Sequence, residues 1–307
     1  MALYRLFPPL NADTIVLAEP AWKGVVDGGD GGGGDGREPG HRARARGAAR
    51  GAGPVRGAHG AGRGARGGRR RRAPGQGAGP APGAVRFRRL DVADPASVAA
   101  FTSWVRDELG GLDILVNNAA VSFNEINTNS VEHAETVLRT NFYGAKKLTE
   151  ALLPLFRRAP TTSRILNISS QLGLLNKLRD PALRRMLQDE SSLTERDVEG
   201  MASRFLAEVG DGTWRGRGWP EVWTDYAVSK LALNAYSRLL AARLAGERVS
   251  VNCFCPGFTR TDMTRGFGKR TAEEAGRVAA GLALLPPRDL PTGKFFKWRT
   301  PQLYSKL

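Results

Sequence analysis

A tract of 61 residues, 24–84, restricts most strongly what this chain can fold into. Glycine fills 22 of its positions, and most of the others are alanine, arginine or proline. The tract has no Leu, Ile, Phe, Tyr, Trp or Met, so it cannot bury enough apolar surface to offset a backbone entropy of about 1–2 kcal/mol per residue. We therefore predict that residues 1–84 are a segment without a core of its own, and that the folded domain spans residues 85–307.

The positive charge of the chain is concentrated in the same tract. The formal net charge is +16, and residues 24–84 contribute twelve Arg against four acidic residues, a local balance of +8. Such an arm can bind RNA phosphates, so a catalytically dead domain with a basic nucleic-acid-binding arm is one alternative. The tract contains no regular Arg-Gly-Gly repeats and no interleaved aromatic residues, which RNA-binding arms use for base stacking. Nucleic acid is therefore not the expected partner.

Length and composition bound the class of protein. A chain of 307 residues suffices for one large α/β domain. It has no run of 18 or more apolar residues, and its first 18 residues lack an apolar block that ends in a cleavage site, so we expect no membrane partner and no secretory signal. Cys253 and Cys255 are too close for a disulfide framework, and no histidine cluster accompanies them, so we expect no metal. These features predict a cytoplasmic protein.

From residue 85 onward, strand-like and helix-like segments alternate. Such alternation is typical of a parallel sheet with crossover helices, the α/β class. Asp94 and Pro95 open the first helix of this part. The expected strands are 85–92, 112–116, 164–170, 249–255 and 292–296, and the expected later helices are 132–156, 181–189 and 194–209.

Tyr226 and Lys230 have the spacing Y-x-x-x-K. On a helix this spacing places both side chains on one face, one turn apart. An ammonium beside a phenol favours the phenolate, so we expect Lys230 to lower the pKa of Tyr226 toward that of a useful acid or base. Taken alone, the pair is more typical of an ordinary amphipathic helix.

Further motifs accompany the pair in a fixed order. They are Asn-Asn-Ala-Ala at 117–120, Asn141, Asn-Ile-Ser-Ser at 167–170, Asn-Cys-Phe-Cys-Pro-Gly at 252–257 and Thr-Asp-Met at 261–263. Together they resemble the short-chain dehydrogenase/reductase family, most closely its carbonyl-reductase-like branch, which includes plant menthone and morphinan ketone reductases. The resemblance runs over residues 85–296 and implies a Rossmann-like, doubly wound parallel sheet.

The resemblance implies a catalytic set of four residues. Tyr226 would donate a proton to the substrate carbonyl oxygen, and Ser170 would hydrogen-bond the same oxygen. Lys230 would tune Tyr226 and bind ribose hydroxyls. Asn141 would complete a proton relay through a water, although an Asn inside a helix could instead mark a kink or face solvent.

The same resemblance implies the cofactor and its contacts. The cofactor would be NADP (as NADPH), and the substrate a small lipophilic ketone or aldehyde. Besides Tyr226 and Lys230, the implied cofactor-binding residues are Asp91 and Val92 at the adenine, Asn118 at the nicotinamide-side ribose and Thr261 at the carboxamide. Asp91 could alternatively, or also, cap the following helix. The chain departs from the family pattern at Ala120, where Gly is usual, and at Thr259, where Val is more common.

One further interpretation explains the composition of the glycine-rich tract. In this part of the chain the family has a first strand, a cofactor turn T-G-x-x-x-G-x-G, a helix and a second strand. Read one base later, the codons of residues 35–43 permit the string T-G-A-N-R-G-I-G. We therefore interpret residues 25–79 as a frame-shifted translation, with the first strands missing or disrupted in residues 24–84. This interpretation leaves two sheet edges open and makes the printed chain a poor reductase.

A long insertion separates Ser170 from Tyr226. It contains the two helices expected at 181–189 and 194–209, and it spans residues 176–220. In the carbonyl-reductase-like branch, such an insertion covers the helix face that other members use to form tetramers. We therefore expect a monomer.

Overall fold

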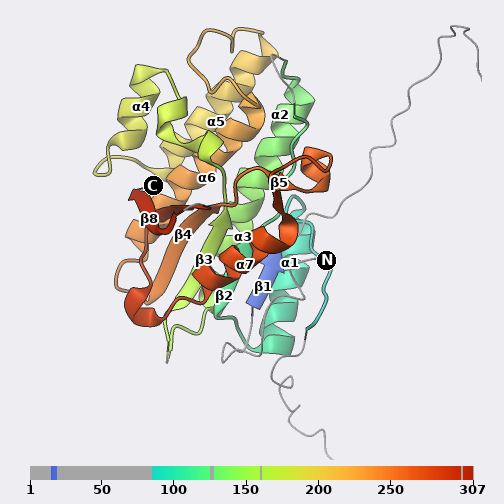
Figure 1. Ribbon diagram of the computed structural model, residues 1–307, viewed down its shortest axis with the longest axis vertical. Helices are drawn as coiled ribbons and strands as arrows, with labels where there is room; N and C mark the ends of the chain where they lie inside the picture. The colour runs from blue at the N-terminus through green and yellow to red at the C-terminus, as the bar shows by residue number, and fades with distance from the viewer. Residues whose placement is uncertain (1–14, 19–84, 125–127, 160, 299, 307) are drawn as a thin grey trace, which may run out of the picture. The chain divides into compact units, whose positions relative to one another are not determined.

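A six-stranded sheet lies at the centre of the structure, a computed structural model that describes residues 15–18, 85–124, 128–159, 161–298 and 300–306 (Figure 1). The strand order is β1-β2-β3-β4-β7-β8. The first five strands are mutually parallel, and β8 is antiparallel to β7. The strands are β1 (Ile15–Ala18), β2 (Ile114–Asn117), β3 (Ser163–Ile168), β4 (Val249–Cys255), β7 (Lys294–Lys297) and β8 (Thr300–Lys306). The predicted α/β class is confirmed.

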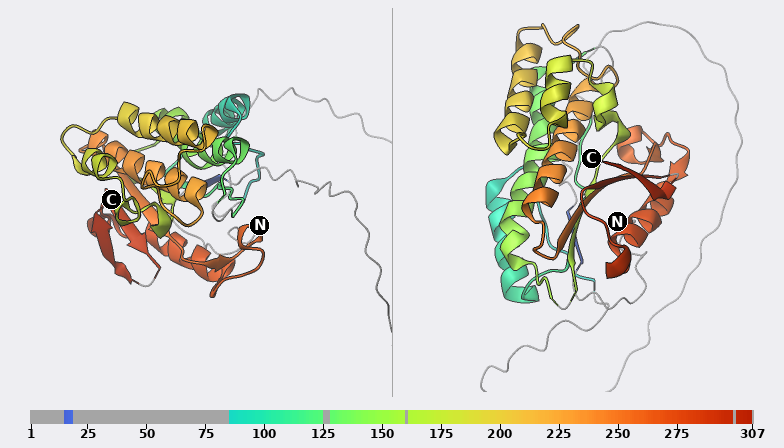
Figure 2. Two further views of the ribbon diagram at one scale, coloured as in Figure 1. Left: turned by 90° about the horizontal axis from the view of Figure 1, so that it is seen from above. Right: turned by 90° about the vertical axis from the view of Figure 1, so that its left-hand side faces the viewer.

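Helices cover both faces of this sheet (Figure 2). The larger core joins Leu115 and Ile165 of the sheet to the helices α1 (Pro95–Trp104), α2 (Val131–Leu138), α3 (Ala145–Leu152), α5 (Glu195–Gly210) and α6 (Thr224–Arg243). The opposite core joins Ile114 and Val116 to α7 (Ala272–Ala283). Neighbouring residues of one strand thus face opposite layers, which explains why β2 is apolar throughout.

The segment 85–92 was predicted to be a strand, and this prediction is wrong. No strand is formed there, and Val85 and Phe87 are exposed, Phe87 by 83%. Leu90 and Val92 are buried, so only the end of the segment reaches the core. In the described part of the chain no neighbouring strand offers hydrogen bonds to this segment, and its alternating arginines favour solvent.

The edge of β2 was expected to be open, and this expectation is also wrong. Ile15 pairs with Ile114 and Ala18 with Asn117, in a parallel register of four residues. A short apolar segment before the glycine-rich tract therefore occupies the place beside β2. The tract itself, its frame-shift interpretation and its nucleic-acid role lie outside the described residues.

The helix predicted at 132–156 is present but interrupted. Between α2 and α3 the chain widens into a π-helical turn, Arg139–Gly144, which contains Asn141. Such turns occur frequently at functional sites. Gly144 closes the turn against Val92, and a Cβ at this glycine would lie 2.8 Å from the Val92 Cγ2. Glycine therefore allows the segment after Arg89 to pack against the helix.

The two helices predicted in the insertion are confirmed as α4 (Pro181–Gln188) and α5. Asp180 caps α4 through the backbone N–H groups of Ala182 and Leu183, and Thr194 forms a capping box with Asp197 at the start of α5. α5 packs against α2 and α6. Lys146 of α3 fastens it further, with ion pairs of 2.7 Å to Glu195 and 2.6 Å to Glu199.

Within the described ranges, no helix has the length and apolarity that a membrane crossing requires. The same residues contain no group of three or more His, Cys, Asp or Glu suited to hold a metal ion.

Candidate active site

Helix α6 carries Tyr226 and Lys230 into the region beyond the carboxyl end of β3. Lys230 is 2% exposed, and its Nζ donates a hydrogen bond of 2.8 Å to the carbonyl oxygen of Ile168, the last residue of β3. The same Nζ lies 5.5 Å from the centre of the Tyr226 ring. The predicted pairing of the two side chains on one helix face is therefore present.

Ser170 reaches Tyr226 from the end of β3. Its hydroxyl lies close enough to the Tyr226 side chain to lower the pKa of that phenol, and it accepts from the Leu172 backbone N–H at 3.2 Å. Ser169 has a structural role, as expected, since its hydroxyl donates to Asn234 Oδ1 at 2.6 Å. Asn234 in turn donates to the carbonyl of Gly173 at 3.0 Å. One side chain of α6 thus holds both flanks of the Ser170 turn.

The electrostatics of the pair differ from the prediction for Tyr226. Burial raises the pKa of Tyr226, the nearby Cys255 adds to this, and the Ser170 hydroxyl opposes it. Burial lowers the pKa of Lys230 from 10.5 to about 8. The expected lowering of the phenol pKa by Lys230 is wrong, because the ammonium is directed at Ile168 and burial outweighs its field. Tyr226 therefore stays protonated near neutral pH.

Asn141 is fully buried, which rules out the solvent-facing alternative. Its side chain accepts from the Val121 N–H at 2.8 Å and donates to the Val121 carbonyl at 2.9 Å. It also donates to Ser229 Oγ at 3.0 Å. Asn141 therefore fixes the loop that follows Asn118 and contacts the neighbour of Lys230, while the water-borne relay stays a prediction.

The predicted cofactor residues lie on segments that follow the strands. Asp91 accepts from the Ala93 N–H at 2.9 Å, and Asp94 is the residue that caps α1, so the capping alternative for Asp91 is wrong. Val92 is buried, and Asn118 follows β2 directly. Thr261 begins the exposed turn after β5 (Thr259–Arg260). In open α/β sheets, ligands bind at the carboxyl ends of the parallel strands.

Sequence reasoning missed Asn234, Gly173 and Trp223. Asn234 stands four residues after Lys230 on α6, so helical spacing from the Y-x-x-x-K pair could have found it. Gly173 carries no such signal, because its role is a close approach to α6 that only the tertiary structure shows. Trp223 has a left-handed backbone (φ 49°, ψ 61°), which no local sequence pattern predicts.

The donors at this site fit the nicotinamide and ribose half of a dinucleotide. Lys230 has three N–H donors, and among the described residues its Nζ makes one hydrogen bond. Ser170, Tyr226, Asn118 and Thr261 add hydroxyl and amide groups around the same strand ends. The segment that would hold the pyrophosphate follows β1 and lies outside the described residues.

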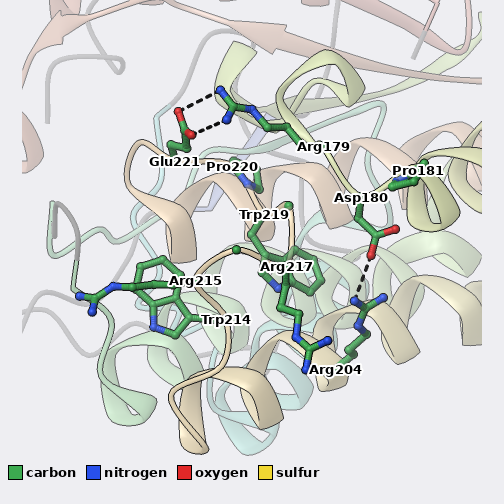
Figure 3. Close-up of a pocket in the computed structure, with 12 residues that line it drawn as sticks. Arg179, Asp180, Pro181, Arg204, Trp214, Arg215, Arg217, Trp219, Pro220 and Glu221 are labelled. Carbon is green, nitrogen blue, oxygen red and sulfur yellow. Dashed lines mark hydrogen bonds and ion pairs between the residues drawn. The ribbon is translucent and has the colours of Figure 1, made fainter.

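A cavity lies in the insertion, apart from these residues (Figure 3). It measures about 600 Å³ and is lined by the loop 214–221 and the start of α4. Arg179 pairs with Glu221 at 2.6 Å, and Arg204 pairs with Asp180 at 2.9 Å. Both of these guanidinium groups are therefore compensated within the wall of the cavity. It contains none of the predicted catalytic residues.

Comparisons with known proteins match most of the described region. A family profile described as "short chain dehydrogenase" matches residues 69–180, and one described as "Enoyl-(Acyl carrier protein) reductase" matches residues 213–283. Short-chain dehydrogenase/reductase 1 of Saponaria officinalis is 37% identical over 233 residues, which cover 69% of this chain and 76% of that protein. Carbonyl reductase [NADPH] 3 of Mus musculus is 36% identical over 209 residues, which cover 66% of this chain and 73% of that protein. The solved structure of salutaridine reductase from Papaver somniferum superposes with a TM-score of 0.63 at 32% identity, covering 69% of this chain and 81% of that one.

Proposed function

This chain belongs to the short-chain dehydrogenase/reductase family of oxidoreductases, and we propose that it reduces the carbonyl group of a small lipophilic ketone or aldehyde with NADPH. The observation that carries the proposal is the position of the Tyr226 ring 5.5 Å from the buried ammonium of Lys230, with the Ser170 hydroxyl close enough to act on the pKa of the phenol. The coenzyme choice is supported by the similarity to a carbonyl reductase whose name specifies NADPH.

Residues of the chain itself would donate the proton, stabilise the carbonyl oxygen and return the proton. NADPH, when bound, supplies the hydride. Tyr226, whose phenol is protonated at neutral pH, delivers the proton to the carbonyl oxygen. Ser170 donates a hydrogen bond to the same oxygen and stabilises the charge that develops there. Asn141, held in the π-helical turn, would support proton return toward Lys230.

The cofactor would be held by residues at the strand ends. Lys230 and Tyr226 would bind the nicotinamide-side ribose together with Asn118. Thr261 would bind the carboxamide, and Asp91 with Val92 would bind the adenine. In sequence, β1 is followed by Glu-Pro-Ala-Trp-Lys at 19–23, without the glycines that let backbone N–H groups approach a pyrophosphate. We therefore propose that this chain binds NADPH weakly.

The remaining proposals concern the state of the protein. Two buried free cysteines support a cytoplasmic protein, since reducing compartments keep thiols free. The packing of α5 on α2 and α6 supports a monomer, because α5 then covers the helix face that other members of the family use to form tetramers.

Turnover at millimolar NADPH tests the proposal. The purified chain is incubated with a panel of lipophilic ketones and aldehydes, and the alcohols are quantified by gas chromatography. We expect alcohol formation that depends on NADPH and is lost in Tyr226→Phe. Absence of alcohol with every carbonyl, combined with a salt-dependent RNA shift, would favour the nucleic-acid-binding alternative.

A further inference from the structure

Trp223 joins the insertion to α6 and adopts a conformation that is unusual for its side chain. Its backbone is left-handed (φ 49°, ψ 61°), a region that glycine and asparagine enter readily and bulky residues rarely do. Its carbonyl accepts the hydrogen bond from the Ala227 N–H at 2.7 Å, which the backbone of any residue could do. Its side chain makes no capping hydrogen bond. The start of the helix therefore does not explain why a tryptophan stands there.

The surroundings of the indole do suggest a reason. The ring centre lies 6.3 Å from that of Tyr226, with the planes nearly perpendicular at 83°. It lies 6.1 Å from the ring of Phe258, which comes from the turn after β4. Both distances are those of interacting aromatic pairs. Phe258 is 47% exposed and Trp223 is only partly buried, so the two rings present an accessible aromatic surface beside the catalytic phenol.

We propose that Trp223 is a specificity-determining residue for the reaction, an inference that rests on the proposed reductase function. With Phe258 it forms an aromatic wall against which a flat ring attached to the substrate carbonyl stacks. Strained backbone conformations persist where the surrounding structure holds them, and they cluster at active sites. A planar aryl ring can stack in an offset or edge-to-face arrangement, whereas a puckered saturated ring cannot. The chain therefore favours aryl ketones and aldehydes over their saturated-ring counterparts.

Two ketones of nearly equal size isolate this effect. Acetophenone and cyclohexyl methyl ketone differ in the planarity of the ring and share the methyl ketone group. Both are supplied in one reaction of the full chain at millimolar NADPH, and the two alcohols are quantified by gas chromatography. Because the ketones compete for the same enzyme molecules, the product ratio reports relative kcat/KM whatever fraction of the enzyme holds cofactor.

We expect Trp223→Leu to lower the ratio of aryl to saturated-ring product by about threefold to tenfold, the range that aromatic stacking supports. Trp223→Phe keeps most of the preference. Trp223→Asn loses it. Trp214→Leu, the same substitution in the insertion loop, leaves the ratio unchanged. An unchanged ratio in Trp223→Leu, or an equal change in Trp214→Leu, overturns the inference.

Failure of the reductase function would show separately, as absence of both alcohols from the wild-type chain. In that case saturation-transfer NMR with the same two ketones decides the inference. Stronger transfer to the acetophenone ring in wild type than in Trp223→Leu supports the aromatic wall. Equal transfer in the two proteins overturns it.

Discussion

The backbone of Lys230 leaves no room for a side chain at Gly173. A Cβ at this glycine would overlap the Lys230 carbonyl carbon and lie 2.5 Å from the Leu231 nitrogen. These atoms belong to the middle of α6 and cannot move without the helix. The turn that carries Ser170 is therefore pressed onto α6 beside the lysine, and Asn234 holds it there from both sides.

We expect Gly173→Ala to destabilise the protein by about 1–3 kcal/mol, because the added methyl group overpacks a backbone contact. Its turnover per folded molecule should also fall, since Ser170 shifts with the turn. Gly200→Ala is the matched control, because a Cβ at this glycine of α5 meets nothing within 4 Å. This control should gain about 0.5–1 kcal/mol from helix propensity. Urea unfolding of both variants checks the pair, and equal stabilities would contradict the close approach.

Tyr226→Phe should lower turnover by about 100-fold to 10,000-fold, the range for loss of a general acid. The ring packs alike, so the melting temperature and the binding of reduced nicotinamide riboside should stay near those of the wild type. Tyr236→Phe provides the control. Tyr236 is also on α6 and donates to Glu150 at 2.6 Å, so this variant should lose stability and keep its turnover. Turnover near the wild-type value in Tyr226→Phe would remove Tyr226 from the role of acid.

Stability should rise between pH 7.5 and pH 9.5 because of Lys230. Its pKa falls from 10.5 to about 8 on folding, so above pH 8 the unfolded chain binds more protons than the folded one. The cost of burying the ammonium is present below pH 8 and fades as the pH rises toward 10.5. The free energy of unfolding should increase over this window by about 2 kcal/mol relative to Lys230→Met. Urea titrations of both proteins at the two pH values measure the difference, and parallel pH dependences would contradict it.

Most of the fold follows from the sequence because its elements are locally consistent. The apolar runs at β2, β3 and β4 and the cap Asp94 point to the same elements that the structure shows. The strand predicted at 85–92 is absent because a strand needs a neighbouring strand to pair with. The alternation of apolar and polar residues does not show whether such a neighbour exists. For Ile15–Ala18 the error was the opposite one. The folded domain was expected to begin at residue 85, yet these four apolar residues form a strand that pairs with β2.

The sequence predicted which side chains of the candidate site lie close together, but it did not predict the direction of the Tyr226 pKa shift. Helical spacing brings Tyr226 to Lys230, and the end of β3 brings Ser170 to Tyr226. The direction of the Tyr226 pKa shift depends on where the ammonium points. That orientation is set by the carbonyl of Ile168, a tertiary contact. Sequence spacing shows which groups are near and leaves the balance between burial and charge open.

The protein should be a monomer in solution. α5 packs on α2 and α6, and ion pairs from Lys146 and Arg243 to Glu195 tie it to α3 and α6. A second chain would have to displace this helix to use the same face. Light scattering coupled to gel filtration should give the mass of a single chain, and the mass of a tetramer would rule out the covering role of α5.

The chain as printed should bind NADPH weakly despite its catalytic residues. The parallel pairing of β1 with β2 supplies a strand leading toward the phosphate region. In sequence, however, β1 is followed by Glu19 and Pro20, a carboxylate that repels phosphate and a residue without a backbone N–H. A version in which residues 25–79 are replaced by their shifted reading frame restores the turn T-G-A-N-R-G-I-G. We expect the printed chain to bind NADPH at least about a thousandfold more weakly than this version, which corresponds to a loss of roughly 4 kcal/mol of pyrophosphate contacts.

Calorimetry on the two proteins measures this difference, and reduced nicotinamide riboside is the internal control. This ligand lacks phosphate and needs only the groups around Tyr226 and Lys230, so both chains should bind it with equal affinity. Equal NADPH affinities in the micromolar range would show that the printed tract supplies a pyrophosphate site after all. If the riboside binds only the restored chain, the ribose-binding groups at Tyr226 and Lys230 depend on the turn as well. The hydrogen bond from Lys230 to the Ile168 carbonyl would then not be enough to order the ammonium for binding.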